Sequence, residues 1–396
     1  MNKLFKNYHR IVIKIGSSLL VEDQKIREKW LNKFVEDIAN LIEKKHEIII
    51  VTSGAVALGR SILFNDNFLK LTLADKQACA SVGQIKLMSI YQEIFKKHNL
   101  TIAQILLTAS DCNDHERYLN CQNTIKKLIK LKAIPIINEN DSVAIDEIKI
   151  GDNDRLASRV SQIAEANLLI LFSDIDGLYD KNPKINKDAK FIPEVNEINF
   201  KIENMAKGSQ SKIGTGGMIT KIQAAKMALN ADCPTIITNG IEDHALEKLN
   251  SGSKKYTIFC KKNYDKNIVN YNKNLTENNF SNPVKIKKIT TKKNWLSGIV
   301  NAKAELIIDK KASETLIKNK VSLLAVGVME IKGNFTKGDV VYIKNQQGIH
   351  IASGIVNYSK KDAEKILKKN SQEIRKILGK SAKPELVHLD NLVIVN

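Results

Sequence analysis

Residues 48–55 read Ile-Ile-Ile-Val-Thr-Ser-Gly-Ala, which is a run of β-branched residues, a turn of small residues and the start of a helical stretch. Uninterrupted β-branched runs are typical of strands that are buried on both faces in a parallel sheet. The same order, a short apolar run followed by a helix-forming segment, recurs along residues 10–238. This alternation predicts an α/β fold, with a mainly parallel open sheet sandwiched by helices.

Hydrophobic periodicity predicts the individual elements of this fold. We expect strands at Arg10–Ile15, Ile48–Val51, Thr101–Leu107, Ile134–Ile137, Leu168–Phe172 and Thr235–Thr238. We expect helices at Lys25–Lys44, Ala55–Leu63, Leu73–Lys97, Asp114–Leu131, Asp154–Ala166 and Met218–Leu229. Since the carboxyl ends of parallel strands meet at one edge of a sheet, the residues that follow each strand are the candidates for a site.

An asparagine-rich segment interrupts the pattern and divides the chain. We expect a first domain over residues 1–262, a linker over residues 263–290 and a second domain over residues 291–396. In the second domain, short apolar runs such as Val321–Val328 are separated by glycine turns at Gly333, Gly338 and Gly348. This pattern of short apolar runs and glycine turns is typical of a small β-rich domain. A helix with a lysine-rich face is expected at Asp362–Leu378.

Composition limits the class of protein. The 396 residues are 43% hydrophobic, which is enough for a sizeable core and excludes a disordered chain. Five scattered cysteines form neither a disulfide framework nor a metal-binding pattern. No apolar run reaches the roughly 18–20 residues that a membrane helix needs. Because the N-terminus also lacks an apolar leader segment, we expect a cytoplasmic protein with no membrane contact.

Positive charge is concentrated in the second domain. The formal net charge is +19 for the whole chain, of which +5 belongs to residues 1–260 and +14 to residues 261–396. A basic domain can attract nucleic acid or acidic surfaces. The alternative is compositional drift in a chain that is rich in lysine throughout, and the sequence leaves both interpretations open.

The first two strands end in segments suited to an anion. Lys14, followed by Gly16, would place an ammonium group at the carboxyl edge of the sheet, where the glycine lets a phosphate approach the backbone. After the second strand, Ser53 and Gly54 precede a helix whose N-terminus is a candidate anion site. A lysine whose head reaches water and a plain tight turn are the alternative interpretations.

Two clusters of carboxylates and amides follow further along, Asn138-Glu139-Asn140-Asp141 and Gly151-Asp152-Asn153-Asp154. Such side chains can bind an ammonium group or hold lysines in position. Turn and N-cap chemistry explains either cluster alone. Two clusters after successive apolar segments favour the functional interpretation.

A third kind of segment is rich in glycine. Residues 214–221 hold three glycines and lead into a helix, so that the backbone can wrap phosphates while Lys221 lies one turn into the helix. The spacing is that of neither a Walker A loop nor a dinucleotide-binding loop.

The segment Ser173–Tyr179 contains Asp-x-Asp-Gly, but its spacing excludes an EF-hand calcium loop.

Taken in order, these motifs resemble the glutamate 5-kinases (γ-glutamyl kinases) of the amino acid kinase family over about residues 8–262. The segment Gly333–Gly354 resembles part of a PUA domain. The resemblance implies ATP-dependent phosphorylation of the γ-carboxylate of L-glutamate to L-glutamyl 5-phosphate, the first step of proline biosynthesis. It also implies Mg²⁺ between the β- and γ-phosphates of ATP.

The resemblance further implies a role for particular residues. Lys14 and Lys221 would approach the transferring phosphoryl group as fixed positive charges, with Asp154 holding both lysines in place. Glutamate would be bound by Ser53, Asn138, Asp141, Asp152 and Asn153. ATP would be contacted by Lys14, Gly16, Gly54, Ser173, Asp174, Thr215, Gly216, Gly217, Met218, Ile219, Thr220 and Lys221. No residue is assigned as a protein ligand of a metal ion.

The resemblance implies L-glutamate as the partner molecule and a homo-oligomer, either a dimer or a tetramer. One alternative is a related kinase that acts on another carboxylate, a carbamate or a nucleoside monophosphate, against which the two amide and carboxylate clusters argue. The other is RNA binding by the second domain. We do not favour it, because the aromatic residues there are scattered, at Trp295, Phe335, Tyr342 and Tyr358.

Overall fold

The computed structural model describes residues 4–22, 25–64, 71–144, 153–183, 185–207, 217–261, 291–299, 302, 304–379 and 382–394. The chain divides into two compact units, Met1–Ile286 and Lys287–Asn396, and each is described by itself. The asparagine-rich linker expected over residues 263–290 lies outside the described residues, so its two boundaries stay a prediction.

The first unit is built on a sheet that contains eight strands among its described residues. Their order across the sheet is β10 (Glu194–Val195), β12 (Tyr256–Phe259), β11 (Thr235–Asn239), β7 (Leu168–Ser173), β1 (Arg10–Lys14), β4 (Glu47–Val51), β6 (Ala133–Glu139) and β5 (Thr101–Leu107). All neighbouring pairs are parallel except β11 and β12. The prediction of a mainly parallel sheet is therefore confirmed.

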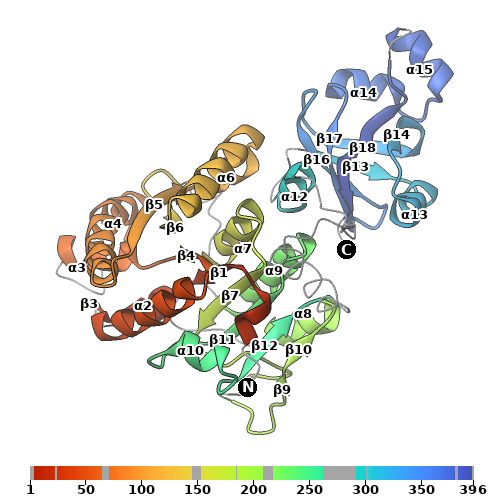
Figure 1. Cartoon of the computed structure of the whole chain (residues 1–396). Helices are drawn as coiled ribbons and strands as arrows, with labels where there is room; N and C mark the ends of the chain where they lie inside the picture. The colour runs from red at the N-terminus through yellow and green to blue at the C-terminus, as the bar shows by residue number, and fades with distance from the viewer. Residues whose placement is uncertain are drawn as a thin grey trace, which may run out of the picture. The chain divides into compact units, whose positions relative to one another are not determined.

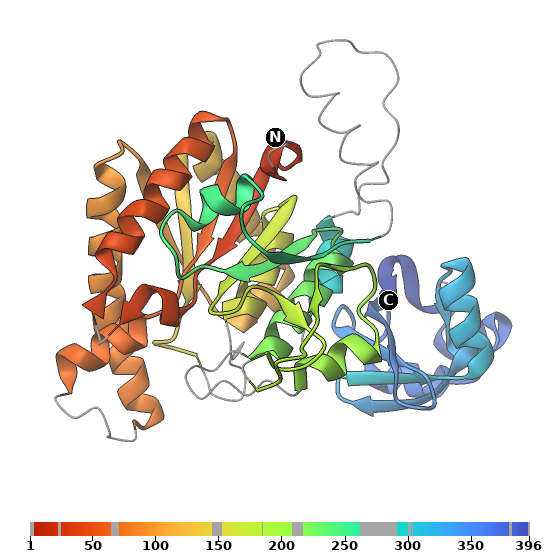
Figure 2. The same ribbon diagram turned by 90° about the horizontal axis from the view of Figure 1, so that it is seen from below.

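Helices cover both faces of this sheet (Figures 1 and 2). On one side, α2 (Glu28–Glu43), α4 (Leu73–Lys96) and α10 (Ala245–Asn250) pack on alternate strand residues such as Ile11 and Ile13. On the other side lie α6 (His115–Lys130), α7 (Asn153–Ile163) and α9 (Met218–Asn230), with α7 against β1, β4, β6 and β7. Because side chains alternate along a strand, Lys14 of β1 points to the α7 side.

Shorter helices and several two-residue strands complete the described part of the first unit. Helix α3 (Ala55–Leu63) follows β4 and packs tightly on α4. The remaining elements are η1 (Leu4–Asn7), α1 (Ser17–Leu20), β2 (Val21–Glu22), β3 (Lys25–Ile26), α5 (Ala109–Asn113), β8 (Leu178–Tyr179), β9 (Phe191–Ile192) and α8 (Phe200–Lys207).

The contact between α3 and α4 depends on two glycines. A Cβ atom on Gly59 would lie 1.8 Å from the carbonyl oxygen of Cys79, and one on Gly83 would lie 1.8 Å from that of Ala55. Neither distance is compatible with a side chain, so the two backbones touch at both crossing points. This close approach fixes the position of α4 relative to the turn that follows β4.

The second unit is a β-rich domain, as expected. Its sheet has the order β14 (Leu323–Leu324), β18 (Glu385–Ile394), β17 (His350–Val356), β16 (Val340–Lys344), β13 (Ala304–Ile308) and β15 (Val328–Gly333). Its helical elements are α12 (Thr291–Ser297), α13 (Lys310–Asn319), η2 (Ala325–Gly327), α14 (Lys360–Ile366) and α15 (Ser371–Leu378). All three glycines of the predicted turns have a positive φ, at 82° for Gly333, 95° for Gly338 and 79° for Gly348. Gly338 and Gly348 lie between strands as expected, whereas Gly333 is the last residue of β15.

Some element boundaries predicted from the sequence are wrong. The helix expected from Lys25 begins at Glu28, because Lys25 and Ile26 form strand β3, in which Ile26 pairs with Val21 of β2. The helix expected over Asp362–Leu378 is two helices, since Asn370 caps α15 by accepting from the backbone N–H of Glu373. The apolar run Val321–Val328 is interrupted by the 3₁₀ turn η2.

Other elements were not predicted at all. Helix α13 has few apolar residues, and only Ser313 and Leu316 of its residues are buried. Strand β18 contains polar residues such as Asp390, and its pairing with β17 shifts register, which hides the alternation. Strand β12 lies at the sheet's antiparallel end, where half of its four residues are only partly buried.

Candidate active site

The carboxyl ends of the parallel strands bring Lys14, Asp154 and Lys221 together. Asp154 lies in the first turn of α7, and its Oδ1 is 2.6 Å from Nζ of Lys14 at the end of β1. Its other oxygen, Oδ2, accepts a hydrogen bond of 2.9 Å from Nζ of Lys221 in the first turn of α9. One carboxylate thus holds two ammonium groups that are 207 residues apart in the sequence.

This cluster is buried and carries excess positive charge. Asp154 is fully buried, while Lys14 and Lys221 are 5% and 6% exposed. Burying charges is costly unless they are paired, and here one negative charge pairs with two positive ones. The arrangement leaves a net positive charge at the edge of the sheet where ligands bind in α/β proteins. An anion placed there would gain from both ammonium groups.

Glycines lie in the turns that follow β1 and β4 and directly before α9. A Cβ on Gly16 would lie 3.6 Å from Nζ of Lys14, so the turn after β1 passes close to the ammonium group. Gly54 has a left-handed φ of 103° and precedes α3. Gly217 precedes α9, whose first turn contains Met218, Ile219, Thr220 and Lys221. The side chain of Thr220 donates to the carbonyl oxygen of Gly217 at 2.8 Å.

A neutral network of amides lies beside the charged cluster. Asn153, the first residue of α7, places its Nδ2 within 2.7 Å of Ser53 Oγ and 3.0 Å of Asn138 Oδ1. The same nitrogen is 2.5 Å from the carbonyl oxygen of Thr52. These contacts connect the residues after β4, the end of β6 and the start of α7. Three of the five residues expected to bind glutamate therefore lie together.

Tyr91 of α4 contacts Thr52, the residue that follows β4. Oγ1 of Thr52 is 3.1 Å from the hydroxyl of Tyr91, and both residues are fully buried. Burial raises the pKa of Tyr91, and the hydrogen bond to Thr52 only partly offsets that effect. The tyrosine hydroxyl therefore stays protonated at physiological pH, and it can donate a hydrogen bond to Thr52.

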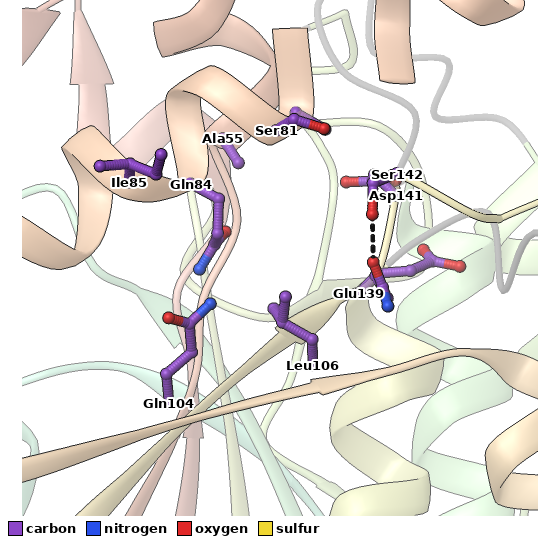
Figure 3. Close-up of a pocket in the computed structure, with 11 residues that line it drawn as sticks. Ala55, Ser81, Gln84, Ile85, Gln104, Leu106, Glu139, Asp141 and Ser142 are labelled. Carbon is purple, nitrogen blue, oxygen red and sulfur yellow. Dashed lines mark hydrogen bonds between the residues drawn. The ribbon is translucent and has the colours of Figure 1, made fainter. Parts of the chain in front are cut away.

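A pocket opens next to this network, and Figure 3 shows the side chains that line it. Its volume is about 270 Å³, and it is lined by Ala55, Ala80, Ser81, Gln84, Ile85, Gln104, Leu106, Glu139, Asn140, Asp141 and Ser142. Asp141 is the residue of this set that the sequence singled out for substrate. Glu139 and Asp141 give the pocket a carboxylate-rich wall, which suits an ammonium group.

The remaining predicted residues divide into those that are described and those that are not. Ser173 ends β7, two strands from β4, and its hydroxyl donates to Oδ1 of Asp174 at 3.2 Å. Because β7 is parallel to β1, Ser173 and Asp174 lie at the same edge of the sheet as Lys14. Asp152, Thr215 and Gly216 lie outside the described residues, so their roles stay predictions.

One group of potential metal ligands was not anticipated. Ligand atoms of Asp37, His244 and Glu247 lie within 4.8 Å of one another. Both oxygens of Asp37 are already engaged, because Nδ1 of His244 is 2.7 Å from Oδ1 and the backbone N–H groups of Leu246 and Glu247 donate to Oδ2. The cluster therefore caps the N-terminus of α10, on the face of the sheet opposite to α7 and α9.

Comparison with known protein families gives the assignment. Residues 9–239 match the model described as "Amino acid kinase family", which is more than half of the chain. The chain belongs to the amino acid kinase family. Residues 304–378 match the PUA domain model, in agreement with the β-rich second unit.

Relatives in this family align over nearly the whole chain. A protein named glutamate 5-kinase from Pelagibacter ubique is 43% identical, over 97% of this chain and 98% of its own length. Proteins of the same name from Paramagnetospirillum magneticum and Carboxydothermus hydrogenoformans are 41% and 40% identical, with coverage of 97% or more in each direction. Within the described part of the chain, no helix combines the length and the apolar character needed to cross a membrane.

Sequence reasoning missed two contributors to the amide network. Gln84 of α4 accepts from Nδ2 of Asn138 at 2.8 Å, although the two residues are 54 positions apart. The carbonyl oxygen of Thr52 faces Asn153. Gln84 lies in a long helix with no local motif, so nothing in the sequence pointed to it. The contribution of Thr52 comes from its backbone, which side-chain patterns do not reveal.

Proposed function

We propose that this chain catalyses the ATP-dependent phosphorylation of the γ-carboxylate of L-glutamate to L-glutamyl 5-phosphate, the first step of proline biosynthesis. The observation that carries this proposal is the convergence of Lys14 and Lys221 on the single carboxylate of Asp154, at 2.6 and 2.9 Å. The names of the full-length relatives support the choice of acceptor.

The reaction transfers one phosphoryl group. An oxygen of the γ-carboxylate attacks the γ-phosphorus of ATP, the bond between that phosphorus and the bridging oxygen breaks, and ADP leaves with the electron pair. Such transfers need mainly alignment and stabilisation of charge. The ammonium groups of Lys14 and Lys221 supply fixed positive charge to the phosphoryl oxygens, and Asp154 prevents the two groups from moving apart.

The nucleotide side of the site is formed by backbone and small side chains. We assign Gly16, Gly54, Ser173, Asp174 and residues 215–221 to ATP, as the family resemblance implies. The N-terminus of α9, which has 13 residues, presents backbone N–H groups that favour phosphate. Both oxygens of Asp154 face lysines and are poorly placed to bind a metal ion. Mg²⁺ would therefore be held by the phosphates, whose charge it neutralises.

The acceptor side is formed by Ser53, Asn138, Asp141, Asp152 and Asn153. Amide and hydroxyl groups suit the carboxylates of glutamate, and the carboxylates of the protein suit its ammonium group. The pocket beside them, at about 270 Å³, is large enough for a small amino acid. Asp141 lies in its wall and is the residue that we expect to pair with the ammonium group.

The direct test is an assay of ADP release with Mg-ATP and L-glutamate, with hydroxylamine present to trap the acyl phosphate. Glutamate-dependent ADP release together with a hydroxamate supports the proposal. A panel of aspartate, N-acetylglutamate, carbamate and uridine monophosphate examines the acceptor. Turnover with one of these and none with glutamate would assign the chain to a different acceptor.

Further properties implied by the resemblance stay proposals. We propose a homo-oligomer, either a dimer or a tetramer, which light scattering of the full chain measures. We place the enzyme in the cytoplasm, where fluorescence from a tagged chain would show it. RNA binding by the basic second unit is not favoured. If the full chain retains RNA and this retention weakens steeply as salt is added, RNA binding would be favoured after all.

A further inference from the structure

A chain of side-chain amides leads from helix α4 to the acceptor side of the site. It begins at Gln84, whose Oε1 accepts a hydrogen bond of 2.8 Å from Nδ2 of Asn138. Oδ1 of Asn138 in turn accepts from Nδ2 of Asn153 at 3.0 Å. Asn153 is also 2.7 Å from Ser53 Oγ. Gln84 is therefore joined to three residues that we assign to glutamate, although it belongs to a different part of the fold.

One backbone N–H group decides which end of each amide in this chain is the oxygen and which is the nitrogen. The N–H of Glu139 can only donate, and it donates to Oδ1 of Asn138 at 2.9 Å. The other end of the Asn138 amide must therefore be its NH₂ group, which needs an acceptor. Gln84 supplies that acceptor with Oε1. A side chain without an oxygen at this position would leave a buried donor of Asn138 without a partner, since Asn138 is only 2% exposed.

The position of Gln84 is itself fixed by the packing of its helix. Gly83, the preceding residue, touches the backbone of Ala55, which starts α3 directly after Ser53 and Gly54. Helix α4 thus holds Gln84 at a set distance from the turn that follows β4. A rigid helix is better suited than a loop to hold a hydrogen-bond acceptor in one place.

The second half of the Gln84 amide points into the pocket. Its Nε2 is buried and has no hydrogen-bond partner among the described residues. Figure 3 shows the amide of Gln84 facing that of Gln104 from the opposite wall of the pocket. The two ends of the Gln84 amide therefore have different surroundings. The oxygen accepts from Asn138, and the nitrogen lies in the pocket wall.

We propose that Gln84 is a positioning residue for the acceptor, which orients Asn138 and, through it, Asn153 and Ser53. This inference rests on the proposed function, because it concerns the affinity of the same site for glutamate. The hydrogen bond of Gln84 goes to Asn138, whereas Lys14 and Lys221 are both paired with Asp154. Its effect is therefore confined to glutamate, and neither the affinity for ATP nor the chemical step depends on it.

The test compares variants of the full chain. Gln84→Met keeps the length of the side chain but removes the acceptor, and we expect it to raise KM for glutamate by about tenfold. KM for ATP and kcat should stay within threefold. Gln84→Glu retains an oxygen that can accept from Asn138, and it should restore KM to within threefold of the wild type. Gln92→Met, on an exposed position of the same helix, is the matched control and should change nothing.

A double variant separates positioning from a merely structural role. If Gln84 acts through Asn138, then Gln84→Met adds no further increase in KM for glutamate when Asn138 is already alanine. Additive effects of the two substitutions would overturn the inference. So would a Gln84→Met enzyme with unchanged KM for glutamate, or one in which KM for ATP and kcat change as much as KM for glutamate.

Failure of this inference and failure of the proposed function look different. A wild-type chain without glutamate-dependent turnover contradicts the proposed function and removes the basis of the inference. A wild-type chain that phosphorylates glutamate, together with unaltered kinetics of Gln84→Met, contradicts the inference alone. If Gln84→Met does not fold, Gln84→Asn replaces it, because the shorter amide no longer reaches Asn138 and should raise KM for glutamate alone.

Discussion

Two neighbouring regions at the edge of the same sheet are built in opposite ways. The cluster of Lys14, Asp154 and Lys221 consists of charges that are almost completely buried. The network of Gln84, Asn138 and Asn153 consists of neutral amides. Charges act over several ångströms with little dependence on angle, whereas hydrogen bonds between amides depend on direction. The first region suits the stabilisation of a moving phosphoryl group, and the second suits recognition of a fixed substrate.

The largest expected effect separates these two regions by substitution of a lysine. Lys14→Met removes one of the two fixed charges and should lower kcat about 10³-fold, the loss typical of a group that stabilises charge in the transition state. KM for glutamate should change little, because the amide network is untouched. Steady-state kinetics measure both constants. Lys33→Met, which removes a partly exposed lysine paired with Glu36, is the control and should leave both unchanged.

The second prediction concerns the carboxylate between the lysines. Asp154→Asn keeps the size of the side chain but leaves two buried ammonium groups without a counter-charge, so both kcat and thermal stability should fall. We expect a loss of about 10²-fold in kcat and a clear decrease in Tm by calorimetry. Asp188→Asn breaks an exposed ion pair with Lys181 and should alter neither. An Asp154→Asn enzyme with wild-type Tm and kcat would contradict the assigned role of Asp154.

The third prediction affects the support of the amide network. Gly83→Ala forces a Cβ to within 1.8 Å of the carbonyl oxygen of Ala55, and helices α3 and α4 must separate. Overpacking of this kind costs about 1–3 kcal/mol of folding free energy, and more where backbone is the obstacle. Urea unfolding measures the loss, with Ser81→Ala on the same helix as the control. Unchanged stability would show that the contact is not tight in solution.

The smallest expected effect concerns a charged contact at the opposite end of the same strands. Burial raises the pKa of the Glu47 carboxyl, but a hydrogen bond with His9 and the charge of Arg10 outweigh burial and lower that pKa to about 2. The ordinary value is 4.5, so the stabilisation is complete above pH 4.5 and is lost as the pH falls toward 2. Glu47→Gln should flatten this part of the acid unfolding curve without changing kcat. An unchanged acid profile would contradict the pairing.

Much of the fold, and the lysines of the charged cluster, could be predicted from the sequence. Apolar strands and amphipathic helices of the first unit leave strong periodic signals, and a lysine that ends an apolar strand, such as Lys14, is conspicuous. The pairing of Asp154 with both lysines came only from the family resemblance. No local pattern contains a contact between residues that are 67 positions apart, as Asp154 and Lys221 are.

The features that the sequence did not reveal have physical reasons in common. Gln84 looks like any polar residue of a helix, and its role follows only from the distance of 2.8 Å to Asn138. In the second unit, the apolar period of residues 362–378 continues through a helix break. The hydrogen bonds of Asn370 with the start of α15 override that period. Periodicity reports burial, whereas caps and long-range hydrogen bonds decide where helices end and which side chains meet.

The most direct test of the central claim is to measure glutamate binding and turnover together in Lys221→Met. If Lys221 supplies charge to the transferring phosphoryl group, then kcat falls about 10³-fold, while the Kd for glutamate from calorimetry stays within threefold of the wild type. A variant that turns over at a near-normal rate, or one that loses glutamate binding as strongly as it loses turnover, would contradict the convergence of the two lysines on phosphate.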